Sequence, residues 1–116
     1  SDLHPGNVIM NGRQLHVIDF DDAGYGWHQY DLAVSLFDYR SHTEFLLMQN
    51  SLFEGYRQHR RLSDQAISYV PLFLVIRALA LVGWFSDRPE HDERADITGL
   101  VDYAADALER ALAACS

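Results

Sequence analysis

The sequence predicts an α+β fold that is mainly helical, with one β-hairpin ahead of a helical lobe. Two short β-prone runs, residues 8–10 and 15–18, flank Asn11-Gly12, and this dipeptide is a strong signal for a two-residue hairpin turn. From Tyr30 onward, helical segments account for the rest of the chain. A hairpin returns the chain on itself, so the end of its second strand should lie near the start of its first.

Five helical segments are expected after the hairpin. Ser63 is a suitable N-cap for the third, and Asp64 follows it where a negative charge favours the positive end of the helix dipole. In the fifth, apolar residues recur at three-to-four spacing, which predicts one core face. The segments span residues 30–39, 43–59, 63–69, 71–86 and 92–114, and the core face comprises Ile97, Leu100, Val101, Ala104, Leu108, Ala111 and Leu112.

Composition limits the function classes. A chain of 116 residues is long enough for one domain. Its 9 basic and 17 acidic residues give a net charge of −8. Nucleic acids and anionic membranes reward basic patches, so neither is an expected partner. A cationic small molecule is the natural complement, although an acidic surface also simply keeps a protein soluble. The single cysteine, Cys115, cannot form an internal disulfide, which agrees with a cytoplasmic setting.

Residues 66–85 are apolar and long enough to raise the question of a membrane span. Pro71 and Arg77 lie inside this stretch, and both are better explained by a central helix that has Pro71 in its first turn. We therefore predict a helix of the lobe here.

Three polar residues beside the predicted hairpin have the types that phosphoryl transfer requires. Asn7 follows Asp2 by five positions, and Asp19-Phe20-Asp21 comes after the second β-prone run. A kinase has an Asp and an Asn at this spacing, then an Asp-Phe-Gly whose Asp binds metal. Carboxylate and amide oxygens suit a hard cation, and the hairpin should bring Asp19 back toward Asn7. The motifs are therefore interpreted as one site.

Three motifs in order resemble the aminoglycoside phosphotransferase/choline kinase superfamily of small-molecule kinases. They are Ser-Asp-Leu-His-Pro-Gly-Asn-Val-Ile, Val-Ile-Asp-Phe-Asp-Asp-Ala-Gly-Tyr-Gly and Tyr-Asp-Leu-Ala at residues 30–33. The resemblance implies that residues 1–116 form the carboxy-terminal lobe of a protein-kinase-like fold, with the hairpin carrying the site. It also implies that Asp2 is the catalytic carboxylate, that Asn7 and Asp19 hold Mg²⁺ on ATP, and that Asp31 braces the catalytic loop.

Kinases of this fold also clamp ATP from a first lobe, which supplies a glycine-rich loop, a strand Lys and a helix Glu. The sequence contains no Lys and no such loop. We therefore expect the chain to be a fragment of a longer protein that is inactive without its amino-terminal lobe. The hairpin residues that would face that lobe are partly apolar, so self-association of the fragment is expected; they are Val8, Ile9, Val17 and Phe20.

Several of these residues also have simpler interpretations. Asn7 could be a turn amide, and Gly6 a residue that needs a positive φ. Asp21 is either a solvated acid or a second metal contact, and Trp27 either shapes its loop or touches substrate. His4 and His16 suggest a metal site, but no His/Cys cluster has zinc spacing.

Two function classes remain. The first is an ATP- and Mg²⁺-dependent phosphotransferase whose acceptor is a hydroxyl of a small amine-bearing molecule, as in aminoglycoside, choline or homoserine kinases. The alternative is a catalytically inactive pseudokinase, or a module that binds a nucleotide or metabolite. Because Asp2, Asn7 and Asp19 are all retained, the first class is favoured. The sequence does not identify the acceptor or distinguish ATP from GTP.

Overall fold

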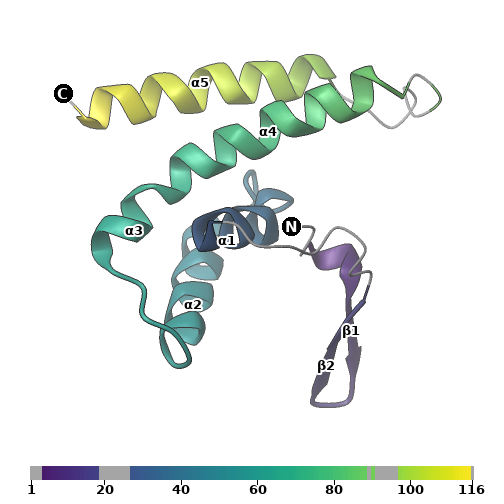
Figure 1. The fold of residues 1–116 in the computed structure, drawn as a ribbon, viewed down its shortest axis with the longest axis vertical. Coiled ribbons are helices and arrows are strands. Elements are labelled where there is room, and N and C mark those ends of the chain that lie inside the picture. Colours follow the sequence, from purple (N-terminus) through teal and green to yellow (C-terminus); the bar gives the residue numbers. More distant parts are fainter. Residues whose placement is uncertain (1–3, 19–26, 89, 91–96, 116) are drawn as a thin grey trace. The chain divides into compact units, whose positions relative to one another are not determined.

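The computed structural model describes residues 4–18, 27–88, 90 and 97–115. They belong to two compact units, residues 1–70 and residues 71–116, which are described separately. The first unit contains a 3-10 helix, a two-stranded antiparallel sheet and three helices, and the second contains two longer helices (Figure 1). The elements are η1 (Pro5–Asn7), β1 (Val8–Asn11), β2 (Gln14–Val17), α1 (His28–Phe37), α2 (Phe45–Arg57), α3 (Asp64–Ser68), α4 (Val70–Ser86) and α5 (Ile97–Cys115). A mainly helical α+β class is confirmed.

The predicted hairpin is present, but its turn lies one residue later than the sequence indicated. Val8 pairs with Val17 at the base of the hairpin, and Asn11 pairs with Gln14 at its tip, which leaves Gly12 and Arg13 as the loop. Gly12 has a φ of +63°. The turns that suit the twist of a hairpin need a positive φ at their first central position, and glycine adopts it without strain. Gly12 therefore takes that position, and Asn11 ends the strand.

Helix α1 supplies most of the core of the first unit. Its sequence is apolar at successive positions, and five of its ten residues are buried: Leu32, Ala33, Val34, Leu36 and Phe37. At its end, Arg40 donates from Nη1 to the Phe37 carbonyl at 3.0 Å, and its guanidinium lies 4.1 Å from the centre of the Phe37 ring. A cation at a helix carboxyl end satisfies carbonyls that have no partner within the helix.

The start of α3 follows the predicted capping chemistry. Ser63 precedes the helix in an extended conformation, and its Oγ accepts from the Ala66 N–H at 3.1 Å. Asp64 follows in the first turn, where Arg57 of α2 donates to its carboxylate at 2.9 Å. The predicted N-cap is confirmed.

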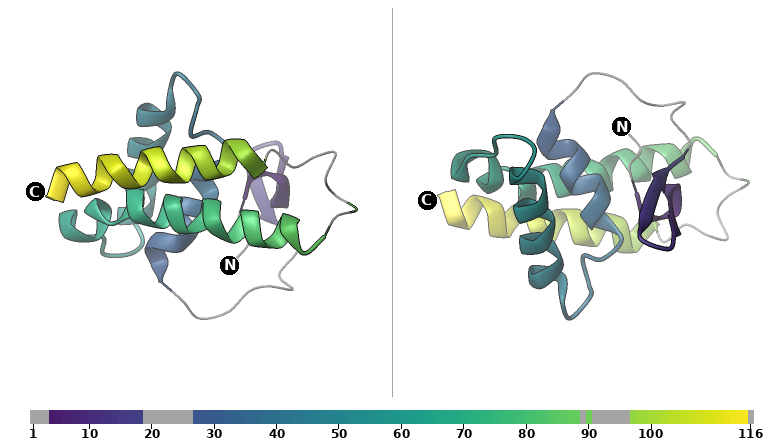
Figure 2. Two further views of the ribbon diagram at one scale, coloured as in Figure 1. Left: turned by 90° about the horizontal axis from the view of Figure 1, so that it is seen from above. Right: turned by 90° about the horizontal axis from the view of Figure 1, so that it is seen from below.

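The second unit consists of α4 and α5, which lie side by side (Figures 1 and 2). Of the predicted core face of α5, Leu100 and Ala104 are buried, but Val101, Leu108 and Leu112 are exposed. At 100° per residue, the exposed members lie on one side of the apolar stripe and the buried members on the other. The prediction that the whole stripe is core is wrong, because the stripe is wider than the surface that covers it.

The question of a membrane span has a direct answer for the described residues. None of their helices combines the length and apolar character needed to cross a bilayer.

Candidate functional site

Pro5–Asn7, directly before the hairpin, form a tight 3-10 turn with His4 as its N-cap. Pro5 begins it, and a proline there has its φ already set for the turn and lacks only an N–H that has no partner in the first turn. The Asn7 N–H donates to the His4 carbonyl at 2.9 Å, and the Val8 N–H donates to the Pro5 carbonyl. This turn, η1, leads directly into β1. The sequence analysis missed it, because three residues carry no periodic pattern.

Asn7 is buried, with 7% of its surface exposed, although the strand residues after it are mostly exposed. Its side-chain Nδ2 lies 3.2 Å from Nε2 of His4. An ordinary turn amide points to solvent, whereas this one is held against a neighbouring ring. A buried polar side chain must have partners to offset its lost hydration. The burial therefore favours a defined role for Asn7 over the turn-amide interpretation.

Gly6 has a different role from the one suggested by its residue type. Its φ is not positive; among the described residues, Gly12 is the glycine with a positive φ. A side chain at position 6 would instead collide with the His4 ring, since a Cβ built there lies 2.9 Å from Cε1 and 3.0 Å from Nδ1. The interpretation of Gly6 as a residue that needs positive φ is wrong. A side chain at position 6 would therefore displace the His4 ring from its place against the backbone.

The hairpin joins the two motifs through the backbone of Asn7. The Ile18 N–H donates to the Asn7 carbonyl at 2.9 Å, which extends the ladder one step beyond the pair of Val8 and Val17. Ile18 directly precedes Asp19 in the sequence. The register therefore brings the chain that leads into the second motif to the end of the first, as the hairpin was expected to do.

Asp2, Asp19 and Asp21 lie outside the described residues. Their assignments as catalytic carboxylate, metal ligand and further contact remain predictions.

Asp31 and Trp27 both lie at the beginning of α1. Asp31 is partly buried in the first turn, where a carboxylate is favourable for the helix dipole, and its carbonyl accepts from Ser35 Oγ at 3.0 Å. Trp27 precedes the helix in an extended conformation and is 72% exposed. The bracing role of Asp31 and a substrate contact by Trp27 stay predictions.

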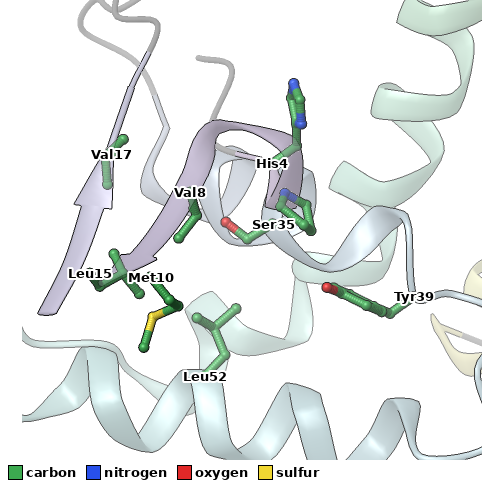
Figure 3. Close-up of a pocket in the computed structure, with 9 residues that line it drawn as sticks. His4, Val8, Met10, Leu15, Val17, Ser35, Tyr39 and Leu52 are labelled. Atoms are coloured by element: carbon green, nitrogen blue, oxygen red, sulfur yellow. The ribbon is translucent and has the colours of Figure 1, made fainter. Parts of the chain in front are cut away.

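An apolar pocket lies beneath one face of the hairpin, and the sequence analysis did not identify it (Figure 3). Residues at alternate positions of a strand share a face, and both cross-strand pairs of this face contribute to the pocket. Ile9 and His16 pair on the opposite face. The pocket is lined by Val8, Met10, Leu15 and Val17 of the hairpin, by His4 and Pro5, and by Ser35, Tyr39 and Leu52.

This register also divides the apolar residues that were expected to face a missing lobe. Val8 and Val17 lie on the pocket face, whereas Ile9, which is 49% exposed, lies on the other. The alternation of strand residues was the signal that separates them. Phe20 is not among the described residues.

Of the two predicted metal ligands, Asn7 lies within the described residues and Asp19 does not. Across residues 4–18, 27–88, 90 and 97–115, no three His, Cys, Asp or Glu side chains gather to hold a metal ion. His4 instead contacts Gly6 and Asn7. The carboxamide of Asn7 offers an oxygen, the ligand that Mg²⁺ prefers, and further oxygen ligands are predicted at Asp19.

Comparison with known proteins places both motifs in one match. The model of the phosphotransferase enzyme family matches residues 1–64, which include η1, the hairpin, α1 and α2. An uncharacterized protein of Deinococcus radiodurans is 30% identical over 92 residues, which cover 75% of this chain and 27% of the relative. Amicoumacin kinase of Bacillus subtilis is 27% identical over 94 residues, which cover 72% of this chain and 27% of the relative.

The chain thus spans about a quarter of the length of these curated relatives. The search of solved structures gives no significant match.

Proposed function

The chain belongs to the phosphotransferase enzyme family, and we propose that it forms the catalytic part of a kinase that phosphorylates a hydroxyl of a small amine-bearing molecule. In this proposal, residues 1–116 are the carboxy-terminal lobe of a protein-kinase-like fold, ATP is the phosphoryl donor, and the hairpin carries the site. The proposal also includes a cytoplasmic location.

One observation carries this proposal: the hydrogen bond from the Ile18 N–H to the Asn7 carbonyl at 2.9 Å. It fixes the register of the hairpin at the end where both motifs meet. A site that holds a cation needs its oxygen ligands within a few ångströms of one another, which residues distant in sequence achieve only through such a fixed return of the chain. The buried position of Asn7 supports the same reading.

The proposed roles follow from residue chemistry. Asp2 orients the acceptor hydroxyl and accepts its proton as the hydroxyl oxygen attacks the γ-phosphorus of ATP. The bond between the γ-phosphorus and the β,γ-bridging oxygen breaks, and ADP leaves. Asn7 and Asp19 are the residues that would hold Mg²⁺, which when bound neutralises charge on the phosphates. Asp31, partly buried at the start of α1, would brace the loop that carries Asp2. Asp21 and Trp27 are candidates for further contacts.

An amine-bearing acceptor is favoured by charge. Between residues 1 and 31 the sequence has five acids, Asp2, Asp19, Asp21, Asp22 and Asp31, against one base, Arg13. Fields of one sign concentrate ligands of the opposite sign near a site. The name of the Bacillus subtilis relative, amicoumacin kinase, supports a small molecule as the phosphoryl acceptor.

The proposal also includes a first lobe that clamps the nucleotide. The sequence has no Lys and no glycine-rich phosphate loop, and the curated relatives are much longer than the aligned region. The 116 residues alone are therefore expected to turn over no substrate and to bind Mg·ATP weakly. They should also self-associate through exposed apolar residues of the hairpin such as Ile9 and Met10. Sedimentation of a monomer at high concentration would contradict the last point.

The decisive experiment measures ATP consumption by the full-length protein with Mg²⁺ and a panel of acceptors. The panel contains aminoglycosides, choline, homoserine, neutral sugars and a protein substrate. We expect turnover with at least one amine-bearing small molecule and none with the protein substrate. Turnover only with neutral sugars would remove the amine from the proposal. Binding of Mg·ATP without turnover of any acceptor would support the inactive module instead.

A further inference from the structure

We infer that His4 is a positioning residue. A hydrogen bond from the Gly6 N–H fixes the orientation of the His4 ring, and the ring in turn fixes the orientation of the Asn7 carboxamide. The hydrogen-bond assignment stands on the geometry of the described residues. Its consequence for cation binding rests on the proposed function, because only there does Asn7 hold Mg²⁺. The two parts are tested by different measurements below.

The first step is the protonation of the ring. The Gly6 N–H donates to Nδ1 of His4 at 3.1 Å, so Nδ1 must present a lone pair. A neutral imidazole carries its proton on one nitrogen and accepts at the other. The proton of the His4 ring therefore resides on Nε2, which makes Nε2 a hydrogen-bond donor.

The second step is the orientation of Asn7. In the structure, Nδ2 of Asn7 lies 3.2 Å from Nε2 of His4. Oxygen and nitrogen of a carboxamide exchange places by a half turn, and the partners decide between the two orientations. With Nδ2 against Nε2–H, two donors would face each other. A half turn of the carboxamide exchanges Nδ2 for Oδ1, and Nε2–H can then donate to Oδ1 of Asn7; because Nδ1 already accepts from Gly6, this exchanged orientation is the one we infer.

Gly6 makes this arrangement possible. A Cβ at position 6 would lie 2.9 Å from Cε1 of the ring, closer than such atoms approach in proteins, and 3.0 Å from Nδ1. Because the φ of Gly6 is not positive, an alanine there meets no backbone strain, and its effect would come from the collision with the ring. The three residues thus contribute differently. Gly6 leaves room for the ring and donates to it, His4 supplies the ring, and Asn7 is the side chain that the ring orients.

The consequence concerns the cation site. Groups that hydrogen-bond to a metal ligand fix its orientation, and their removal costs metal affinity about tenfold to a hundredfold. A carboxamide oxygen has two lone pairs, so acceptance from Nε2–H is compatible with its use as a ligand. His4 therefore has a role beyond capping η1, and a capping role alone would affect stability but not metal affinity.

The test uses the full-length protein and Mn²⁺ as a paramagnetic substitute for Mg²⁺. Free Mn²⁺ is measured by electron paramagnetic resonance during titration in the presence of ATP. We expect His4→Ala and Gly6→Ala each to weaken Mn²⁺ binding by about ten- to a hundredfold. The matched control is His16→Ala, which removes an exposed histidine from the hairpin face that Ile9 shares and should leave Mn²⁺ binding unchanged.

The double variant separates positioning from a general disturbance of the turn. Among the described residues outside its immediate chain neighbours, only His4 has atoms within 4 Å of a Cβ at position 6. Once the ring is gone, His4→Ala/Gly6→Ala should therefore bind Mn²⁺ as His4→Ala does. Losses that instead multiply in the double variant would show that Gly6→Ala acts independently of the ring. That result, or unchanged Mn²⁺ affinity in a folded His4→Ala protein, would overturn the inference.

A second measurement needs neither turnover nor a bound metal. Nitrogen-15 spectra of the histidine rings, with the His4 signals identified by their loss in His4→Ala, report which ring nitrogen carries the proton. We expect the proton on Nε2 and none on Nδ1. A proton on Nδ1 would overturn the assignment even if the variants lose metal affinity. Failure of the unaltered protein to bind Mn²⁺ with ATP would overturn the proposed function, while the spectra still decide the hydrogen bonds.

Discussion

The buried residue of the hairpin segment, residues 4–18, is polar, whereas the buried residues of helix α1 are apolar. In the hairpin segment the buried residue is polar Asn7, and apolar side chains such as Ile9 and Met10 are exposed. In α1 the buried residues are apolar, Phe37 among them, and the acidic Asp31 is only partly buried. A hydrophobic residue gains free energy from burial, whereas a polar one loses hydration and needs hydrogen bonds in return.

The comparison predicts that α1 contributes mainly to stability and the hairpin segment mainly to the proposed site. A two-stranded hairpin alone is marginally stable in water, so the hairpin segment does not hold the fold together. Its side chains can serve a site instead. Helix α1, by contrast, supplies buried apolar side chains to the core of the first unit. Substitutions in the hairpin segment should therefore affect activity more than stability, and those in α1 the reverse.

The largest effect is expected at Asp2. In the full-length protein, Asp2→Asn should lower turnover about 10²- to 10⁴-fold, the usual contribution of a general base, and leave Mg·ATP affinity nearly unchanged. Steady-state kinetics and calorimetric titration with Mg·ATP measure the two quantities. An equal loss of nucleotide affinity would assign Asp2 to the nucleotide and not to the acceptor.

In α1, the largest effect on stability is expected at Phe37, whose surface is only 2% exposed. Phe37→Ala should lower the free energy of unfolding by about 3–5 kcal/mol, because it removes a large buried ring and leaves a cavity. Denaturant unfolding measures this loss. At a temperature where the variant is folded, its KM for ATP should equal that of the unaltered protein. A raised KM without lost stability would break the division between the two regions.

Asp19 tests the other end of the hairpin segment. Asp19→Ala should weaken metal-dependent binding of ATP and lower turnover by about a hundredfold or more, since charge stabilisation by a bound cation is worth several kcal/mol. Titration with Mg²⁺ at fixed ATP follows the change. Unchanged Mg²⁺ dependence would exclude Asp19 from the metal site. The matched control is Asn11→Ala, at the hairpin tip, which should leave Mg²⁺ dependence unaltered.

The smallest effect is expected at a cap outside both regions. Ser63→Ala should lower the free energy of unfolding by about 1 kcal/mol, because the Ala66 N–H loses its acceptor, and should not alter turnover. Ser51→Ala, on an exposed turn of α2, is the control and should shift stability by less than about 0.5 kcal/mol. Equal stabilities of the two variants would show that the Ser63 hydrogen bond contributes nothing.

Local chemistry explains what could be predicted from sequence. Asn11-Gly12 indicated the hairpin, and Ser63 indicated the start of α3, because both signals act within a few residues. The observed turn lies one residue later in the sequence than the predicted one. A dipeptide signal does not say which residue takes the first loop position, and the positive φ of Gly12 decided it.

The remaining features depend on contacts between residues whose relation is visible only in three dimensions. Nothing in the sequence shows that the His4 ring packs on Gly6, because the collision that excludes a side chain there arises from the folded turn. The exposed half of the α5 stripe is a similar case. Apolar spacing predicts an amphipathic helix, but the width of the covering surface sets how much of it is buried.

The register of the hairpin has a consequence for how this region can vary during evolution. The hydrogen bond between Ile18 and Asn7 and the pair of Val8 and Val17 lie at the base, whereas Gly12 and Arg13 lie at the tip. Residues inserted at the tip would lengthen the loop and leave the base paired as before. A single residue inserted within β1 or β2 would turn every following side chain to the opposite face. Length variation among descendants of this sequence should therefore concentrate at the tip, which is also the natural point for a peptide insertion by an engineer.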